Sequence, residues 1–355
     1  MKPNTPLVSV IIPTHNCAAF IVDTLKSLEA QTYTNFEIIV VDDGSTDNTG
    51  TVLAPYCDRI RCIHQENRGA AAARNAGIRQ AQGEFLAFLD ADDVWFPPKL
   101  ELQVQAFKSH PEAGLAFADF LDFDDSGVTR QSRLNTWPEA RAWFERHRVE
   151  GSEIACGHMY GELLAANWIH ASSAIVRRDV LSEVGWFDES LRAGEDLELW
   201  LRVAQRYPFL CVNRVLSGYR YRPESLCGST GSRAMRINRI VVQVLEKHLQ
   251  NRWIPHGLES KVKAALCRRY WALGWNCFGE NRFTESRRFL SQGIRYQPFN
   301  RHLWVYWWAS FLPLSAIEAV RRLRQRRRNY HLPAEPAARN LSITNSGPEG
   351  PHATI

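Results

Sequence analysis

Hydrophobic runs alternate with helix-patterned polar segments through the first 90 residues of the chain. Continuous apolar runs are typical of strands buried on both faces, and they occur at 7–12, 36–41, 59–64 and 84–90. Between the runs, helical spacing predicts helices over Ala18–Ala30, from about Thr49, and over Asn67–Gly83. This alternation predicts an α/β fold with a Rossmann-like, mainly parallel, twisted sheet and helices on both faces.

Three polar loops follow the first, second and fourth predicted strands, at Pro13–Asn16, Asp42–Asp47 and Asp90–Asp93. Ligands of parallel sheets bind outside the carboxyl ends of the strands, so these loops are expected to meet at one crevice. Its carboxylates are hard oxygen ligands, which favour Mg²⁺ or Mn²⁺ bound together with a diphosphate. Asp-rich strand ends that merely turn the chain and cap helices are the simpler alternative. Two such loops in one sheet favour the metal site.

Composition and missing motifs exclude several classes of protein and of nucleotide-binding site. A chain of 355 residues with 45% hydrophobic and 23% charged residues describes an ordinary globular protein. Its eight cysteines are scattered, which suits a reduced, cytoplasmic protein without a zinc site. No apolar stretch is long enough for a membrane span, and the N-terminus lacks a signal-peptide layout. Neither a G-x-G-x-x-G turn after the first strand nor a P-loop motif is present.

From Trp168 the chain predicts another strand, followed by two arginines and the start of a helix. A second acidic feature lies further along, where Glu195 and Asp196 begin a predicted helix that packs apolar residues on the sheet. The helix dipole favours ionised carboxylates at this position, so an acidic helix cap explains the pair as well as catalysis does on spacing alone. After residues 218–225, a Gly/Ser stretch predicts either a lid or a plain interdomain loop. Arg220, Arg222 or Arg233 would reach a phosphate from there.

The C-terminal third predicts an all-helical appendage with one hairpin similar to a single tetratricopeptide repeat. Trp304, Trp307, Trp308 and Phe311 share a helical face, and six arginines follow within 321–328. This pattern predicts contact with an anionic membrane surface over 302–328; a core-facing stripe with a solvated basic tail remains the alternative. The arginines alone give little support for nucleic-acid binding. The expected units are 1–233, 234–300, 301–330 and a disordered tail at 331–355.

Four motifs together resemble the family 2 glycosyltransferases. They read "VSVIIPTHN", "EIIVVDDGSTDNT", "NRGAAAARNAGIRQAQGEFLAFLDADD" and "VGWFDESLRAGEDLELWLR", in this order between about Val8 and Tyr221. The resemblance implies a GT-A fold and a nucleotide-diphosphate sugar donor, with UDP as the family's usual nucleotide.

The resemblance also implies roles for individual residues. The nucleotide-sugar site would comprise Pro13, His15, Asn16, Asp42, Asp43, Arg74, Asn75, Asp90 and Ala91. Within it, Asp43 would accept a hydrogen bond from the base, and Asp90 would face the ribose. Asp92 would hold the metal together with Asp90, with Asp93 close by. Asp196 would be the catalytic base, with Glu195 as second choice.

The chemistry of these groups agrees with a metal-dependent, inverting glycosyltransferase. A cation stabilises the departing diphosphate, and a carboxylate takes the proton of the attacking hydroxyl. A single carboxylate opposite the leaving group implies inversion. The acceptor would be a saccharide or lipid-linked molecule in cell-surface polysaccharide or glycolipid synthesis, with the enzyme cytoplasmic and peripheral at the inner face of the membrane.

Two alternatives are a non-catalytic module that binds nucleotide sugars or carbohydrate and a sugar-1-phosphate nucleotidyltransferase. The intact D-x-D and acidic pair favour turnover over mere binding. A nucleotidyltransferase would carry a glycine-rich loop with a basic residue after the first strand, and "PTHNCAAF" has none.

Overall fold

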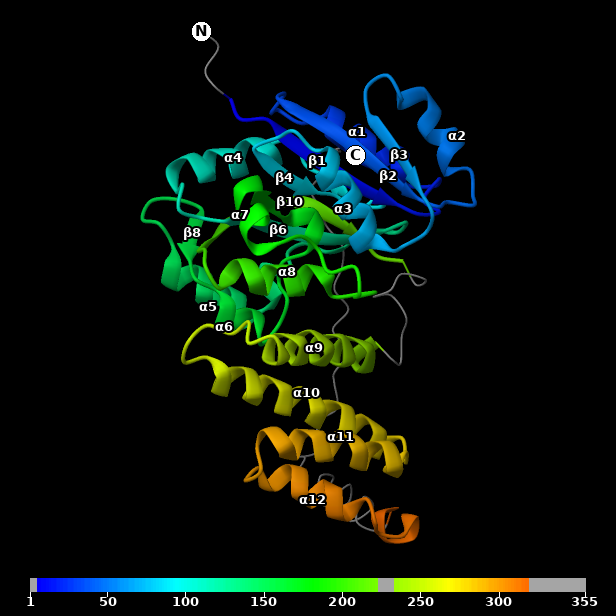
Figure 1. Cartoon of the computed structure of the whole chain (residues 1–355), viewed down its shortest axis with the longest axis vertical. Helices are drawn as coiled ribbons and strands as arrows, with labels where there is room; N and C mark the ends of the chain where they lie inside the picture. The colour runs from blue at the N-terminus through cyan, green and yellow to red at the C-terminus, as the bar shows by residue number, and fades with distance from the viewer. Residues whose placement is uncertain (1–4, 223–232, 319–355) are drawn as a thin grey trace, which may run out of the picture.

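A computed structural model describes residues 5–222 and 233–318 of the chain. Within them, ten strands form one sheet whose main path runs β3-β2-β1-β4-β9-β6-β10-β5, with β7 beside β6 and β8 beside β10. The strands are β1 (Val8–Thr14), β2 (Phe36–Asp43), β3 (Arg61–Gln65), β4 (Phe85–Phe88), β5 (Val94–Trp95), β6 (Leu115–Asp124), β7 (Gly127–Arg130), β8 (Ile154–Gly157), β9 (Ile175–Arg177) and β10 (Phe209–Arg220). Helices cover both faces of the sheet (Figure 1), which confirms the predicted α/β fold.

The helices of the sheet-containing part are α1 (Ile21–Glu29), α2 (Thr49–Leu53), α3 (Ala70–Gln80), α4 (Lys99–Ser109), α5 (Pro138–His147), α6 (Tyr160–Leu163), α7 (Arg178–Val184) and α8 (Glu195–Ala204). Strands β3, β2, β1 and β4 pair in parallel, as the sequence predicts. Thr14 lies beside Asp42 in this register, so β1 and β2 end at the same edge of the sheet.

The second half of the sheet is mixed rather than parallel. Strand β9 pairs antiparallel with β4 and β6, whereas β10 runs parallel to β6. The strand expected from residue 168 onward shrinks to Ile175–Arg177 because residues 171–173 form a 3₁₀ turn. In that turn the Ser173 hydroxyl donates to the carbonyl of His170 at 2.8 Å. Such local side-chain bonds compete with the strand ladder.

Helix α3 lies unusually close to β1 because residue 77 is glycine. A Cβ atom at Gly77 would lie 2.4 Å from Cγ2 of Ile11, which is fully buried. The same helix carries Arg74 one turn earlier, so this close approach sets how deeply the Arg74 side chain enters the protein.

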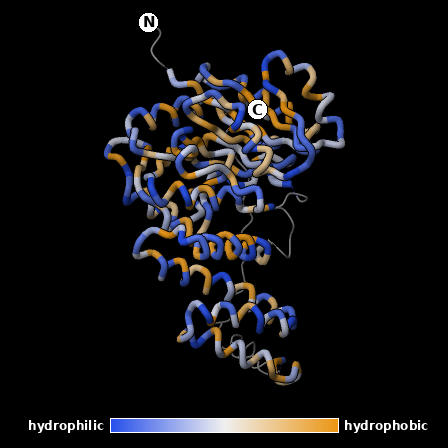
Figure 2. The backbone as a smooth tube through the Cα atoms, viewed as in Figure 1, coloured by the Kyte–Doolittle hydropathy of each residue, from blue (hydrophilic) through white to orange (hydrophobic). Residues whose placement is uncertain are grey.

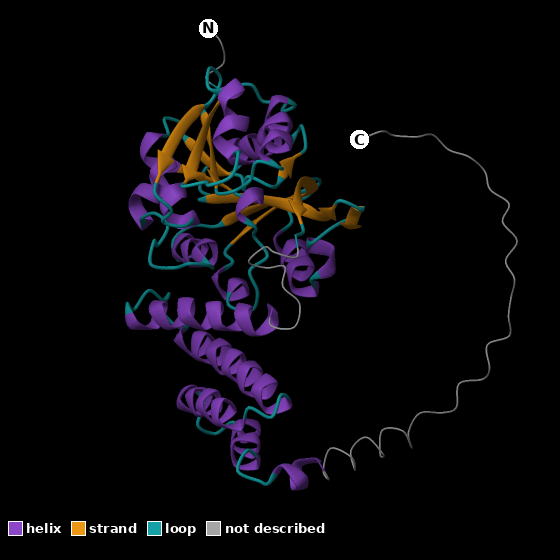
Figure 3. Ribbon diagram, turned by 90° about the vertical axis from the view of Figure 1, so that its right-hand side faces the viewer, coloured by secondary structure: helices purple, strands orange, loops and turns teal. Residues whose placement is uncertain are grey.

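Helices α9 (Arg233–Gln250), α10 (Glu259–Gly279), α11 (Phe283–Tyr296) and α12 (Arg301–Ala309) lie successively further from the sheet (Figures 1 and 3). Hydrophobic and hydrophilic residues alternate along α9 (Figure 2). Helices α10 and α11 form a hairpin in which the Ser286 hydroxyl donates to the carbonyl of Gly274 at 2.8 Å. The predicted helical C-terminal region is therefore present.

Among the helices described, none combines the length and apolarity that crossing a bilayer requires. The expected arginine-rich segment at 321–328 and the disordered tail at 331–355 lie outside the described residues, as does most of the expected lid, since residues 223–232 are not described.

Replacing Gly77 with alanine is expected to lower the free energy of unfolding by about 1–3 kcal/mol, because the new methyl group overpacks the contact with Ile11. Urea denaturation measures the change. Gly50→Ala is the matched control, since residue 50 is also helical and nothing lies within 4 Å of a Cβ built there. An equal, unchanged stability in both variants would contradict the close approach of α3 to β1.

Candidate functional site

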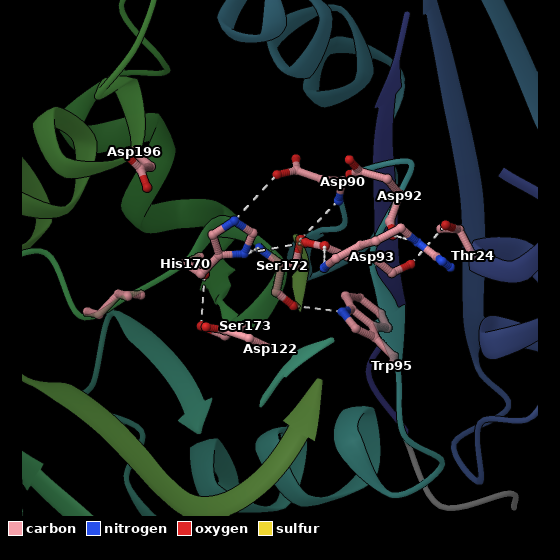
Figure 4. A network of polar contacts seen from close by, with 12 residues as sticks. Thr24, Asp90, Asp92, Asp93, Trp95, Asp122, His170, Ser172, Ser173 and Asp196 are labelled. Carbon is pink, nitrogen blue, oxygen red and sulfur yellow. Dashed lines mark hydrogen bonds and ion pairs between the residues drawn. The ribbon is translucent and has the colours of Figure 1, made fainter. Parts of the chain in front are cut away.

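The turn after β4, which carries the D-x-D motif, is held by hydrogen bonds from three other elements, namely α1, β10 and the 3₁₀ turn at residues 171–173 (Figure 4). From α1, the Thr24 hydroxyl lies 2.9 Å from the carbonyl oxygen of Ala91 and 2.8 Å from that of Asp93. From β10, the backbone N–H of Arg220 donates to Asp93 Oδ1 at 2.9 Å. The Arg220 side chain donates to the carbonyl of Asp92 at 2.9 Å. The position of these aspartates is therefore set by the surrounding fold.

Asp93 is 1% exposed and serves this turn from inside the protein. Its Oδ2 accepts a hydrogen bond from the Ser172 hydroxyl at 2.6 Å. Burial, together with the charges of Asp92 and Asp90, raises the pKa of Asp93 well above its ordinary value. With both oxygens engaged by the protein, Asp93 holds the turn in place.

His170 lies between two of the aspartates (Figure 4). Its Nε2 is 3.7 Å from Asp90 Oδ2 and its Nδ1 is 3.5 Å from Asp93 Oδ2. Burial lowers the pKa of His170 despite the attraction of Asp90. One potential ligand atom from each of Asp90, Asp93 and His170 falls within 4.8 Å of the others.

A buried arginine joins this turn to helix α8. The guanidinium of Arg74, whose side chain is 4% exposed, donates to Asp90 Oδ1 and to Glu195 Oε1, both at 2.6 Å. Burial alone would raise the pKa of Asp90, but attraction to Arg74 and His170 outweighs it, and the pKa lies below its ordinary value. Arg74 and Glu195 are 121 residues apart in the sequence, so the fold alone brings the two acidic motifs together.

Asp92 faces a different arginine. Its Oδ2 lies 2.6 Å from the guanidinium of Arg222. Burial and repulsion from Asp90 raise the pKa of Asp92 above its ordinary value even though Arg222 opposes the shift. The carboxylates of the turn repel one another, and their donor atoms are oxygens, so a hard divalent cation fits this site.

Asp196 stands at the start of α8, next to the glutamate that Arg74 binds. Its Oδ2 accepts a hydrogen bond from the Asn167 amide at 3.0 Å, and its Oδ1 accepts one from the N–H of Leu197 at 2.7 Å. Burial and the charge of Glu195 raise the pKa of Asp196 to about 7. In Figure 4 it lies apart from the aspartates of the turn, with His170 between them in this view.

Gly194 precedes this acidic pair with a φ of +77°. A Cβ atom there would lie 2.3 Å from Cγ2 of Ile240 on α9. A side chain is thus disfavoured both by the backbone and by the neighbouring helix, which fixes where α8 begins.

The loops after β1 and β2 are tied to each other. His15 Nδ1 lies 2.9 Å from the carbonyl of Asp43, and Asn16 Oδ1 accepts from the N–H of Thr46 at 2.8 Å. Asn16 has a φ of 53°, in the left-handed region that asparagine tolerates better than most residues. Asp42 Oδ1 accepts from the N–H of Ser45 at 2.9 Å.

Asp43 is 4% exposed, and its carboxylate joins the end of β2 to the start of α3. It accepts hydrogen bonds from the N–H groups of Arg68 at 2.9 Å and Gly69 at 2.7 Å, and from the Gln65 amide at 2.7 Å. A nucleotide base that binds here would share the Asp43 carboxylate with these backbone N–H groups.

Other predicted nucleotide-site residues have buried or half-buried side chains. The Asn75 side chain pairs with the backbone of Phe187, donating at 2.9 Å and accepting at 3.0 Å. Ala91 is 3% exposed, and its carbonyl faces Thr24, while Pro13 is half-buried at the end of β1. Their nucleotide-binding roles stay predictions.

Sequence reasoning missed His170, Ser172 and Asn167, which orient the carboxylates. They lie in or beside a segment interpreted as a strand. The signal there is weak, since only two adjacent serines interrupt the apolar run.

Comparison with known proteins gives matches to glycosyltransferases. Residues 9–167 match the sequence profile of Glycosyl transferase family 2. An uncharacterised glycosyltransferase of Rickettsia typhi is 34% identical over 216 residues, covering 58% of this chain and 63% of the relative. The chain thus spans less than two thirds of that protein.

The putative teichuronic acid biosynthesis glycosyltransferase TuaG of Bacillus subtilis is 30% identical over 220 residues, covering 61% of this chain and 79% of the relative. Among solved structures, a mannosyltransferase of Pyrobaculum calidifontis in complex with GDP-Man and Mn²⁺ superposes with a TM-score of 0.56 at 21% identity, covering 86% of each chain. This likeness confirms the GT-A type of fold. On the profile match and the similarity to TuaG, the chain belongs to glycosyltransferase family 2.

Proposed function

We propose that this glycosyltransferase is a metal-dependent, inverting enzyme that moves a sugar from a nucleotide-diphosphate donor to an acceptor hydroxyl. The supporting observation is the double ion pair of Arg74 with Asp90 and Glu195. It holds the acidic turn after β4 and the acidic start of α8 around one arginine. A donor-binding group and a proton acceptor are both needed for direct displacement at the anomeric carbon.

Asp92 and Asp90 are the residues proposed to hold Mn²⁺ or Mg²⁺. When bound, such a cation would offset charge on the leaving diphosphate. After burial, repulsion from Asp90 is the next cause that raises the pKa of Asp92, and a bound cation would relieve this repulsion. Arg222, paired with Asp92 at 2.6 Å, is positioned to give up this carboxylate to the cation and to bind a phosphate instead.

Asp196 is the proposed base for the acceptor hydroxyl. Its neighbour Glu195 is already engaged by Arg74, which leaves Asp196 as the member of the pair better suited to accept a proton. A pKa of about 7 is well matched to proton transfer near neutral pH. The Asn167 amide, which donates to Asp196 Oδ2, orients the carboxylate.

For the donor we propose a UDP-sugar, on the family's usual preference, with GDP-sugars as the competing choice because the archaeal mannosyltransferase was solved with GDP-Man. The proposed acceptor is a saccharide or lipid-linked molecule used for a cell-surface polysaccharide or glycolipid. The similarity to TuaG, a putative teichuronic acid biosynthesis glycosyltransferase, supports this proposal. The reaction would take place in the cytoplasm, at the inner face of the membrane.

Asp92→Asn is expected to abolish the part of UDP binding that depends on Mn²⁺, since it removes a charged ligand. Thermal shift with UDP, with GDP and with their sugars, each with and without Mn²⁺, measures this. The exposed Asp58→Asn serves as matched control and should behave as wild type. If each of the three proteins binds UDP and GDP as well without Mn²⁺ as with it, metal dependence is wrong.

Asp196→Asn is expected to lower kcat by roughly 10²–10⁴-fold while leaving the donor affinity near that of wild type, because only proton transfer is lost. A base must be ionised, so wild-type activity should rise with pH through about 7, the pKa of Asp196. The raised pKa also means that ionisation of Asp196 destabilises the fold as pH rises toward and through 7.

The variant should therefore melt higher than wild type at pH 8 and show a smaller difference at low pH, where Asp196 is protonated. Unaltered transfer in Asp196→Asn would remove this residue from the role of base.

Arg222→Met is expected to tighten binding of Mn²⁺ alone by roughly tenfold, since a charge-assisted pair that competes for Asp92 is worth about 1.5–3 kcal/mol. Electron paramagnetic resonance of free Mn²⁺ measures this without turnover. The same variant should bind UDP more weakly in the presence of the metal, and Arg222→Lys should be intermediate. Equal Mn²⁺ affinity in all three proteins would contradict the competition.

A further inference from the structure

Helix α12 lies at the end of the helical stack furthest from the sheet (Figure 1). Several large apolar side chains on this helix and directly after it are exposed. Trp308 is 64% exposed, Val305 59% and Phe311 55%. We call this cluster the apolar tip; its members are Trp304, Val305, Trp308, Phe311, Leu312 and Leu314. Contiguous exposed apolar surface of this kind marks an interaction site on a soluble protein.

Three members of the apolar tip, Trp304, Val305 and Trp308, belong to α12, whose other face is already packed. Leu303 is fully buried against Leu290 of α11. The Trp307 indole, on the same side, donates to the Ser291 hydroxyl at 2.9 Å. The packing of the stack therefore accounts for Leu303 and Trp307 and leaves the aromatic rings of the tip toward solvent.

The rings of the tip support one another at the surface. The Trp308 and Phe311 ring centroids are 6.1 Å apart, and both rings contact Trp307, at 4.9 and 5.0 Å. The Trp304 indole donates to the carbonyl of Pro298 at 2.7 Å. Tryptophan in this situation, apolar but with a satisfied or solvated N–H, suits the boundary between lipid headgroups and acyl chains.

Charge decides which kind of partner fits. No acidic residue occurs between Trp304 and Leu314, and six arginines follow within residues 321–328 of the sequence. Each basic residue near an anionic bilayer contributes about 1 kcal/mol. A second copy of this chain would bring two arginine-rich segments together, and nucleic acid would leave the apolar side chains unexplained.

We propose that the apolar tip docks on an anionic membrane surface. The side chains insert at the headgroup level without spanning the bilayer, since Pro313 interrupts the apolar stretch and no described helix could cross. This inference goes beyond the proposed transfer reaction, because lipid binding needs neither donor nor metal.

Co-sedimentation of the full chain with vesicles tests the docking. Vesicles of phosphatidylcholine mixed with phosphatidylglycerol are expected to bind the protein, and phosphatidylcholine vesicles at least tenfold less well, with binding falling at high salt. The double variant Trp308→Glu/Phe311→Glu should bind the mixed vesicles at least tenfold less tightly than wild type. Val128→Glu, at an exposed valine of β7, is the matched control and should bind as wild type.

A thermal shift with UDP and Mn²⁺ on the same variants separates this inference from the proposed reaction. Loss of vesicle binding with an unchanged nucleotide response supports docking, and the nucleotide response itself can fail without affecting it. Unaltered vesicle binding by the double variant overturns the proposal. So does light scattering that shows a dimer in wild type and a monomer in the variant, which would assign the tip to a second copy.

Discussion

The buried guanidinium of Arg74 is the interaction on which the arrangement of the site depends. A fully desolvated charge is tolerated only with good partners, and Arg74 has two carboxylates at 2.6 Å. One belongs to the turn after β4 and the other to the start of α8, so the pair of bonds fixes two distant elements relative to each other. Helix α3 can deliver the arginine to this depth because Gly77 lets it approach Ile11.

The environment separates the acids of the site by their pKa values. Asp90, bound by Arg74, has a lowered pKa, whereas burial raises those of Asp92, Asp93 and Asp196. Such divergence among neighbouring carboxylates is how one site obtains groups for different tasks. In the proposed reaction, Asp90 would stay ionised, the turn would hold the cation, and Asp196, with its pKa of about 7, would take the proton of the hydroxyl.

The helical stack is built under a different constraint. Its helices bury their apolar faces in sequence, each against the one before, and the described part ends with α12 and the helical residues 314–318. An end helix must either present a polar outer face or find another surface to cover it. Here Trp308 and the neighbouring Phe311 are exposed. These exposed side chains, and not the arginines alone, support the proposed docking on a membrane.

The amino-acid pattern alone predicts the parallel strands, the helices between them and the polar loops at their ends. Periodicity and the residues at strand ends are local properties, so the pattern also indicates the D-x-D turn and the Glu195–Asp196 pair. The folded structure is needed to see that Arg74 joins the turn to the acidic pair, that Arg222 pairs with Asp92, and that His170 and Ser172 contact the turn. The sequence separation is 121 residues for Arg74 and Glu195 and 130 for Arg222 and Asp92, and no local pattern specifies which distant side chain a buried charge will meet.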